Sequence, residues 1–584
     1  METKKYLSRS EFLKLSAAGL GGLILASCQR RSAITPTKVS TLPTLSIETQ
    51  APAKLPEGTN ATLIFTNGKI ITVDPSNTIT QACAISGERV LKTGSNEEML
   101  ALASADADVI DLAGRTVTPG LIDPHLHFRG YGLMNSYYVS YNPPDVIDIP
   151  SMQRKLADDL KGMPSGEWIN GTYMAFGDKP IPTKEDLDPV SPNNPVFMMH
   201  IGGHWGTANT VAMELANITA NTPSPEGGII EKVDGELTGV FLNHRAMDVL
   251  RQAAPPITDS LVRKSILETQ TLMASCGVTC FHDNNIRDIE TIQSYQELTD
   301  RGELFLRNNL YLTLEWPSDL NKVDQVDVIR NDITRFMGYK FLIDGQGPTA
   351  YTHEPHNGTA WQMTTWEPAM FKDTIKSLHD TGLQICVHCI GDAASDLVLE
   401  AYEGAMNANP RSDPRHRIEH AVLTTPQTTQ KMKDLGVVVS TQPAFIYLFG
   451  DGWQSLFGKE RMDRIMVTRE WLDAGLHLAI GSDAPSTPFY FPQASLAGAM
   501  TRFTFNRTPI APDQGMSFME ALKAHTIEAA YAGHQEQVLG SLEPGKFADL
   551  VVWPQDPTTM STRDLALTER VAMTFVGGKL VYQM

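Results

Sequence analysis

Short apolar runs alternate with longer stretches of helical periodicity through the middle of the chain. Eight of these runs have the length and the apolar character of β-strands: Val117–Asp123, Val278–His282, Phe305–Leu312, Lys340–Asp344, Gln384–His388, Arg417–His420, Val437–Thr441 and Leu478–Asp483. Alternation of strand and helix is typical of a parallel sheet, and eight such units close a β/α barrel. The pattern therefore predicts an α/β protein built on an eight-stranded β/α (TIM) barrel.

Two further regions accompany the predicted barrel, which we place at 117–535. Roughly 150 residues separate its first and second strands, which is too long for a simple crossover. We therefore expect an inserted subdomain at about 130–277. Short strand-like segments also lie near both chain ends: Ala61–Phe65, Lys69–Val73, Ala82–Ile85, Val90–Lys92, Ala548–Trp553 and Lys579–Tyr582. "NGKIIT" and "GGKLVY" are similar hairpin halves, so we expect 60–116 and 536–584 to pair in a small β-sandwich domain.

The first 28 residues have the pattern of an export signal. A basic region is followed by the apolar stretch Leu15–Ser27, and the segment "LASC" ending at Cys28 resembles a bacterial lipobox. "SRSEFLK" resembles a twin-arginine motif in which Ser10 replaces the second arginine, so the Tat and Sec routes both stay open. A plain anchor helix is the alternative. Residues 29–59, rich in Ser, Thr and Pro, are expected to be a flexible linker behind a lipid-anchored Cys28 at the cell surface or in the periplasm.

The composition excludes several classes of partner. The net charge of −19 argues against nucleic acid, whose phosphates need basic side chains. No apolar run of membrane-spanning length follows the N-terminal segment, so we expect membrane contact only through the lipid anchor. Besides Cys28, the cysteines are odd in number and lie in apolar surroundings, which predicts free core thiols. They are Cys83, Cys276, Cys280, Cys386 and Cys389.

Histidine and aspartate follow the ends of several predicted strands. His125 and His127 are one residue apart in "DPHLHF", and residues i and i+2 of a strand point to one face. Packing and hydrogen bonding are the simpler roles for such a pair. However, His388, His420 and Asp483 end three other predicted strands, and barrel enzymes place their chemistry at these ends. Together they predict a divalent metal site.

Lys340 interrupts an apolar run in the fourth predicted strand. Burying an ammonium group is costly unless the group is paired or neutralised, and a lysine beside metal cations loses its proton readily. A neutral amine can combine with carbon dioxide to form a carbamate, whose two oxygens can bridge two metals. The alternative is a lysine that pairs with Asp344 or extends to the strand end.

These motifs resemble those of the amidohydrolase superfamily, and most closely amidohydrolase family 3, which includes N-substituted formamide deformylases. The similar segments, such as "PGLIDPHLHF", "HCIGDAASD", "HRIEHA", "STQP" and "LEPGKFADLVVW", extend over nearly the whole chain after the linker. The resemblance implies two divalent ions, usually zinc. His125, His127 and Asp483 would hold one ion, and His388 and His420 the other. Carbamylated Lys340 would bridge them.

Two segments depart from the family pattern. "DGQGPTAYT" replaces a stretch like "DGSLGSRTA", and Gly202-Gly203-His204, with Trp205 directly next, replaces an Asp-Gly-His motif. Because both segments face the substrate in that family, the resemblance leaves the substrate open. His200, His204 and His282 are candidate pocket residues, for which core or loop positions are the alternative.

The resemblance implies hydrolysis of a carbon–nitrogen bond in a small amide-like molecule by water activated at the metals. Asp483 would take the proton and pass it to the leaving nitrogen, and His204 would stabilise the oxyanion. The same metal site could instead serve a deaminase or an ester or lactone hydrolase. A lipid-anchored binding or regulatory protein without catalysis is the alternative from another class.

Overall fold

The computed structural model describes residues 47, 50–142, 145–173, 181–203, 205–225, 228–356 and 364–584. The predicted signal peptide, Cys28, most of the linker and His204 therefore lie outside the described residues. The described residues divide into two compact units, of which one contains residues 134–258 and the other contains those from 47 to 133 together with 259–584. Among the described residues, no helix has both the length and the apolar character needed to cross a membrane.

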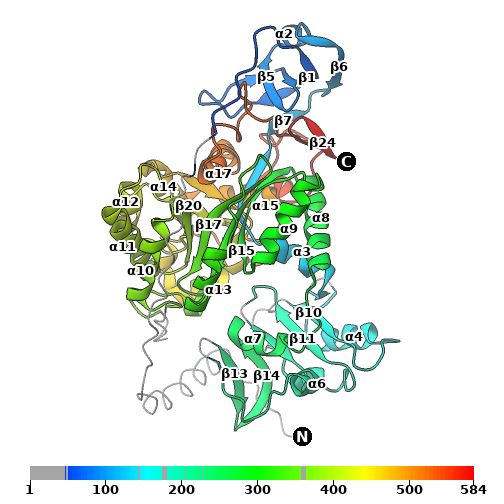
Figure 1. Cartoon of the computed structure of the whole chain (residues 1–584), viewed down its shortest axis with the longest axis vertical. Coiled ribbons are helices and arrows are strands. Elements are labelled where there is room, and N and C mark those ends of the chain that lie inside the picture. Colours follow the sequence, from blue (N-terminus) through cyan, green and yellow to red (C-terminus); the bar gives the residue numbers. More distant parts are fainter. Residues whose placement is uncertain are drawn as a thin grey trace. The chain divides into compact units, whose positions relative to one another are not determined.

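The second unit contains the predicted barrel, a sheet of eight parallel strands in which each strand pairs with the next barrel strand along the chain (Figure 1). They are β8 (Leu121–Leu126), β15 (Val278–Ile286), β16 (Arg307–Leu314), β17 (Thr334–Leu342), β18 (Gln384–Cys389), β19 (Arg417–His420), β20 (Val438–Thr441) and β21 (Leu478–Ile480). Just beyond the strand ends, the Asp483 amide donates to the His125 carbonyl and the His127 amide donates to Ala484, both over 2.8 Å. These bonds connect the last strand to the first, and the predicted eight-stranded barrel is confirmed.

The first and fourth predicted strands differ most in their bounds from the strands of the structure. The first run is split at Gly120 into β7 (Thr116–Pro119) and β8, which belong to different sheets. A Cβ at Gly120 would come within 2.1 Å of the Thr279 hydroxyl, so no side chain fits at this branch point. The fourth strand begins at Thr334, and Lys340 lies near its end, not at its start. Gly338 interrupts the apolar pattern from which the start of this strand would be predicted. The position requires glycine, because a Cβ there would lie only 1.9 Å from the Gln384 carbonyl of β18.

Helices cover the outside of the barrel sheet (Figure 1). They include α8 (Asp259–Ser275), α9 (Ile289–Asp300), α10 (Pro368–His379), α11 (Asp392–Ala408), α12 (Pro426–Asp434), α13 (Ala444–Met462), α14 (Thr468–Ala474) and α15 (Pro492–Thr501). In α10, Glu367 caps the Met370 amide and Pro368 occupies the first turn, which is favourable because proline lacks the amide hydrogen that would be unpaired there. The apolar face of α10 then buries Phe371, Ile375 and Leu378.

Both chain ends form a domain of two sheets. One sheet contains β5 (Arg89–Gly94), β4 (Ala82–Ser86), β1 (Ala61–Thr66) and β6 (Ala103–Asp111) in that order. The other contains β24 (Lys579–Gln583), β23 (Met573–Val576), β22 (Leu550–Val552), β7, β2 (Lys69–Ile71) and β3 (Ile79–Thr80). Phe65, Ile85 and Phe575 are among the side chains of their shared core. Since β7 pairs with β22 on one side and β2 on the other, the two chain ends share one sheet, as predicted.

The inserted unit contains a six-stranded sheet of its own. Its order is β13 (Ile229–Val233), β14 (Glu236–Leu242), β12 (Trp205–Ala208), β11 (Val196–His200), β10 (Ile169–Tyr173) and β9 (Val139–Tyr141). The helices α4 (Ile149–Asp159), α6 (Thr210–Leu215) and α7 (His244–Arg251) belong to this unit. Phe197, Phe241 and Met247 pack in one of its hydrophobic cores. The unit follows the first barrel strand, as predicted, whereas α8 packs on β15 and α9 of the barrel.

A buried ion pair joins the barrel to the terminal domain, and its removal should destabilise the protein. Arg307 of β16 donates two hydrogen bonds to Asp549, over 2.8 and 3.1 Å, and both side chains are 3% exposed. Arg307→Ala should cost about 3–5 kcal/mol of unfolding free energy because it leaves a buried carboxylate unpaired. The matched control is Arg301→Ala, whose pair with Glu297 is exposed and is expected to contribute about 0–1 kcal/mol. Equal urea midpoints for the two variants would contradict this prediction.

Candidate metal centre

The two histidines that end β8 converge on one oxygen atom. His125 is fully buried and His127 has a side chain that is 24% exposed. Their Nε2 atoms lie 3.3 and 2.9 Å from Oδ1 of Asp483, which follows β21 at the other end of the sheet order. The alternation of side chains along a strand thus brings both rings to the carboxylate that the sequence predicts for the same site.

His420 and Asp483 both have left-handed backbone conformations, with φ of 74° and 54°. Such φ values are rare outside glycine, cost about 1–3 kcal/mol each, and gather at functional sites. His420 is the last residue of β19, and Asp483 follows the end of β21. Strain is therefore stored at two of the residues that the sequence identifies as candidate ligands.

The donor atoms of His125, His420 and Asp483 all lie within 4.8 Å of one another, and all three residues are buried. Among the residues that the structure describes, this is the one group of at least three His, Cys, Asp or Glu residues so arranged. His388 lies beside the group, with its ring centroid 4.5 Å from that of His420. The ends of β8, β18, β19 and β21 thus supply one cluster.

Lys340 lies near the end of β17 and is 3% exposed. Burial lowers the pKa of its ammonium, while the charges of Glu419 and Asp483 oppose that shift. Within the described part of the chain, no ion pair joins Lys340 to an acidic side chain. The Asp344 carboxylate instead accepts backbone hydrogen bonds, including one of 2.8 Å from Gly391, and lies 3.7 Å from His388 Nε2. The pairing with Asp344 that we considered for Lys340 is therefore not present.

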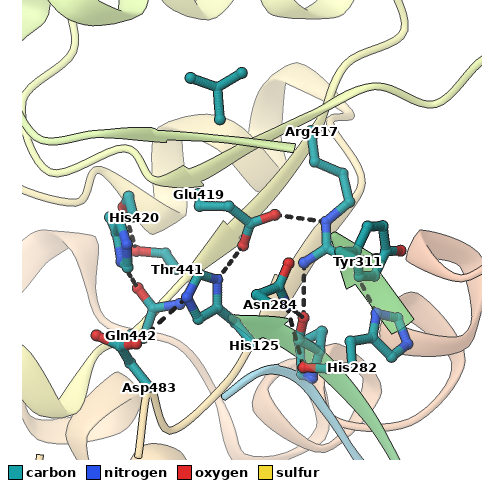
Figure 2. A network of polar contacts seen from close by, with 12 residues as sticks. His125, His282, Asn284, Tyr311, Arg417, Glu419, His420, Thr441, Gln442 and Asp483 are labelled. Atoms are coloured by element: carbon teal, nitrogen blue, oxygen red, sulfur yellow. Dashed lines mark hydrogen bonds and ion pairs between the residues drawn. The ribbon is translucent and has the colours of Figure 1, made fainter. Parts of the chain in front are cut away.

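Two buried side chains, neither of them predicted from the sequence, orient the histidine rings. Nδ1 of His125 lies 2.5 Å from the Glu419 carboxylate, and Nδ1 of His420 lies 2.5 Å from the Gln442 amide oxygen (Figure 2). A hydrogen bond at one ring nitrogen fixes the tautomer and leaves the other nitrogen to a metal. The charged pair R-x-E inside the buried strand "HRIEHA" was the signal that could have revealed Glu419.

The protonation states of the cluster suit a divalent cation. Burial lowers the pKa of His420 to about 3 and also lowers that of His127, although Asp483 opposes the latter shift. Burial alone would raise the pKa of Asp483, but the neighbouring imidazoles of His125 and His127 hold it well below its ordinary value. The result is neutral imidazole beside ionised carboxylate. Nε2 of His125 is buried without a hydrogen bond, so this donor set fits a metal.

The other candidate pocket histidines lie in different surroundings. His282 is fully buried in β15, where its Nδ1 lies 2.9 Å from the Arg417 guanidinium. It is therefore a core residue and not part of an open pocket. His200 ends β11 of the inserted unit, and its ring stacks on Trp205 with centroids 3.9 Å apart.

Comparison with known proteins agrees with this geometry. The model of the Amidohydrolase family matches residues 108–582. The N-substituted formamide deformylase of Arthrobacter pascens is 29% identical over 551 residues, which cover 89% of this chain and 98% of that enzyme. The protein LONG AFTER FAR-RED 3 of Arabidopsis thaliana is 28% identical, with coverage of 90% of this chain and 92% of that protein.

A solved structure shares both sequence and fold. The uncharacterized metal-dependent hydrolase from Pyrococcus furiosus is 26% identical, with a TM-score of 0.68 over 85% of this chain and all of that one. The resemblance predicted from the strand-end motifs is confirmed. Since the family model spans far more than half of the chain, the protein belongs to the Amidohydrolase family.

Proposed function

We propose that the protein hydrolyses the carbon–nitrogen bond of a small-molecule amide with two divalent metal ions, zinc in the native protein. Membership in the family makes it a hydrolase of non-peptide carbon–nitrogen bonds that uses a divalent metal. The observation that carries the finer proposal is the buried convergence of His125, His420 and Asp483 at the barrel strand ends. The full-length relation to an N-substituted formamide deformylase supports an amide as the substrate.

The cluster offers more ligands than one tetrahedral zinc ion uses. We assign His125, His127 and Asp483 to one ion, and His388 and His420 to the other. Lys340 would link the two after its neutral amine attacks carbon dioxide, which forms a nitrogen–carbon bond and releases one proton. Burial of Lys340 without an ion pair to any described acidic side chain supports this assignment, because burial favours the neutral amine that the reaction needs.

The chain's own residues hold and move the protons of the reaction. Bound divalent metal supplies a water of lowered pKa and polarises the substrate carbonyl. Asp483, 2.9 Å from His127, accepts the proton from the attacking water and delivers it to the leaving nitrogen. His204, which lies outside the described residues, stabilises the developing oxyanion.

We further propose that the mature protein begins at a lipidated Cys28 and is exported. The "LASC" segment before the linker supports this proposal, and Gln29 provides no acidic retention signal, so an outer membrane is the expected destination where the cell has one. The linker then separates the anchor from the folded body.

Protein reconstituted with zinc should contain two ions per chain by elemental analysis, and His125→Ala and His420→Ala should each contain fewer. The matched control is His353→Ala, which removes a surface histidine that is 56% exposed and bonded to Asp396, and should leave two ions. Full amidase activity with no more than one ion per chain would contradict the two-metal centre.

Lys340→Ala should lose metal and activity together, because the bridging negative charge between two cations disappears. We expect activity to fall by at least about 100-fold, with partial recovery when acetate is added or when glutamate replaces the lysine. Metal content and turnover on a panel of amides and esters are the measurements. Lys372→Ala, which removes an exposed lysine paired with Glu400, is the control. Normal metal content with near-normal turnover in the alanine variant would rule out the bridge.

Cys28→Ser should release the protein from the membrane fraction or block its maturation, since no thiol remains to carry the lipid. Cell fractionation and metabolic labelling with a fatty acid would measure this. An unchanged, labelled membrane fraction would show that the anchor lies elsewhere.

A further inference from the structure

A fully buried ion pair lies inside the barrel, on the same strand as the candidate ligand His420. Nε of Arg417 lies 2.7 Å from Oε1 of Glu419, and both side chains are 0% exposed. Removing two charges from water costs more than their attraction usually returns, so such a pair is weak evidence for stability alone. We therefore expect the Arg417–Glu419 pair to have a role other than stabilising the fold.

Arg417 reaches across the barrel interior to the strand that carries the first ligands. Its Nη2 donates to the Pro124 carbonyl of β8 over 2.7 Å, and its Nη1 lies 2.9 Å from His282 Nδ1 of β15 (Figure 2). In the sheet order, β18, β17 and β16 lie between β19 and β15. The guanidinium thus holds the backbone of the residue directly before His125.

Glu419 holds the ring of the same histidine. Its Oε2 lies 2.5 Å from Nδ1 of His125, while Nε2 of that ring faces Asp483 at 3.3 Å. An ionised carboxylate can only accept at Nδ1, so His125 takes the tautomer with a bare Nε2. Backbone and ring of His125 are therefore fixed by two side chains that are themselves paired.

The short strand β19 supplies this arrangement through its backbone. Arg417 and Glu419 are two residues apart and point to the same face of the strand. His420 would point to the opposite face, but its left-handed φ of 74° redirects it toward the cluster. One four-residue strand therefore contributes a candidate ligand and a charged pair that holds another.

We propose that Glu419 is a positioning residue that strengthens metal binding through His125, and that Arg417 holds Glu419 in place for this role. This inference rests on the proposed metal-dependent function. The counterpart of Glu419 at His420 is the neutral amide of Gln442. Of the rings of His125 and His420, the ring of His125 is the one backed by a full negative charge, so the loss of Glu419 should weaken the ion at His125 more than the ion at His420.

The test measures zinc binding and unfolding separately. Zinc-loaded wild type, Glu419→Gln and the double variant Arg417→Met/Glu419→Gln are titrated with a competing chelator, and the metal-free proteins are unfolded in urea. Glu419→Gln leaves the buried charge of Arg417 unpaired, so the urea midpoint of this variant should fall. The double variant removes both charges and should recover stability. The matched control is Asp549→Asn, which breaks another buried arginine–carboxylate pair away from the strand ends.

We expect both Glu419 variants to bind one of the two zinc ions about 10–100-fold more weakly and to retain the other. Asp549→Asn should lower the urea midpoint but bind both ions as the wild type does. Zinc affinity within about 3-fold of wild type in the double variant would overturn the positioning role, as would an equal loss in Asp549→Asn. A wild-type protein that binds no zinc would contradict the proposed function, and the inference with it.

Discussion

The two backbone hydrogen bonds between the ends of β8 and β21 are the constraint on which the site depends. They connect His125 with Asp483 and His127 with Ala484, each over 2.8 Å, across more than 350 residues of sequence. Without them the eight strands would form an open sheet, and the candidate ligands on its first and last strands would lie far from one another. Closure of the barrel therefore brings the imidazoles of one end of the chain to the carboxylate of the other.

Closure alone does not give a metal site, because each donor must also point inward in the right protonation state. Burial lowers the pKa of the imidazoles of His127 and His420, and the neighbouring rings of His125 and His127 keep Asp483 ionised. Gln442 and Glu419 direct the rings, and left-handed backbone at His420 and Asp483 directs the side chains. The site thus combines closure, burial and local strain, which are independent features of the fold.

The sequence predicts the features that depend on local patterns. The eight apolar runs, the histidines at their ends and the pairing of the two termini all follow from alternation and turn residues, and the structure has them. The branch at Gly120 was missed because one apolar run serves two sheets, and run length alone does not show where it divides. Glu419 and Gln442 were missed because their role depends on which ring lies opposite, which only tertiary contact decides.

The central claim is that two divalent ions lie between the strand ends, held by histidines and an aspartate from four parts of the chain. Anomalous scattering from a crystal of the zinc-loaded protein, recorded on both sides of the zinc edge, tests it most directly. The account predicts two peaks, one within bonding distance of His125 and Asp483 and the other of His388 and His420, with density for a carbamate on Lys340 between them. A crystal with no peak at the strand ends, or with zinc bound only at surface histidines, would contradict it.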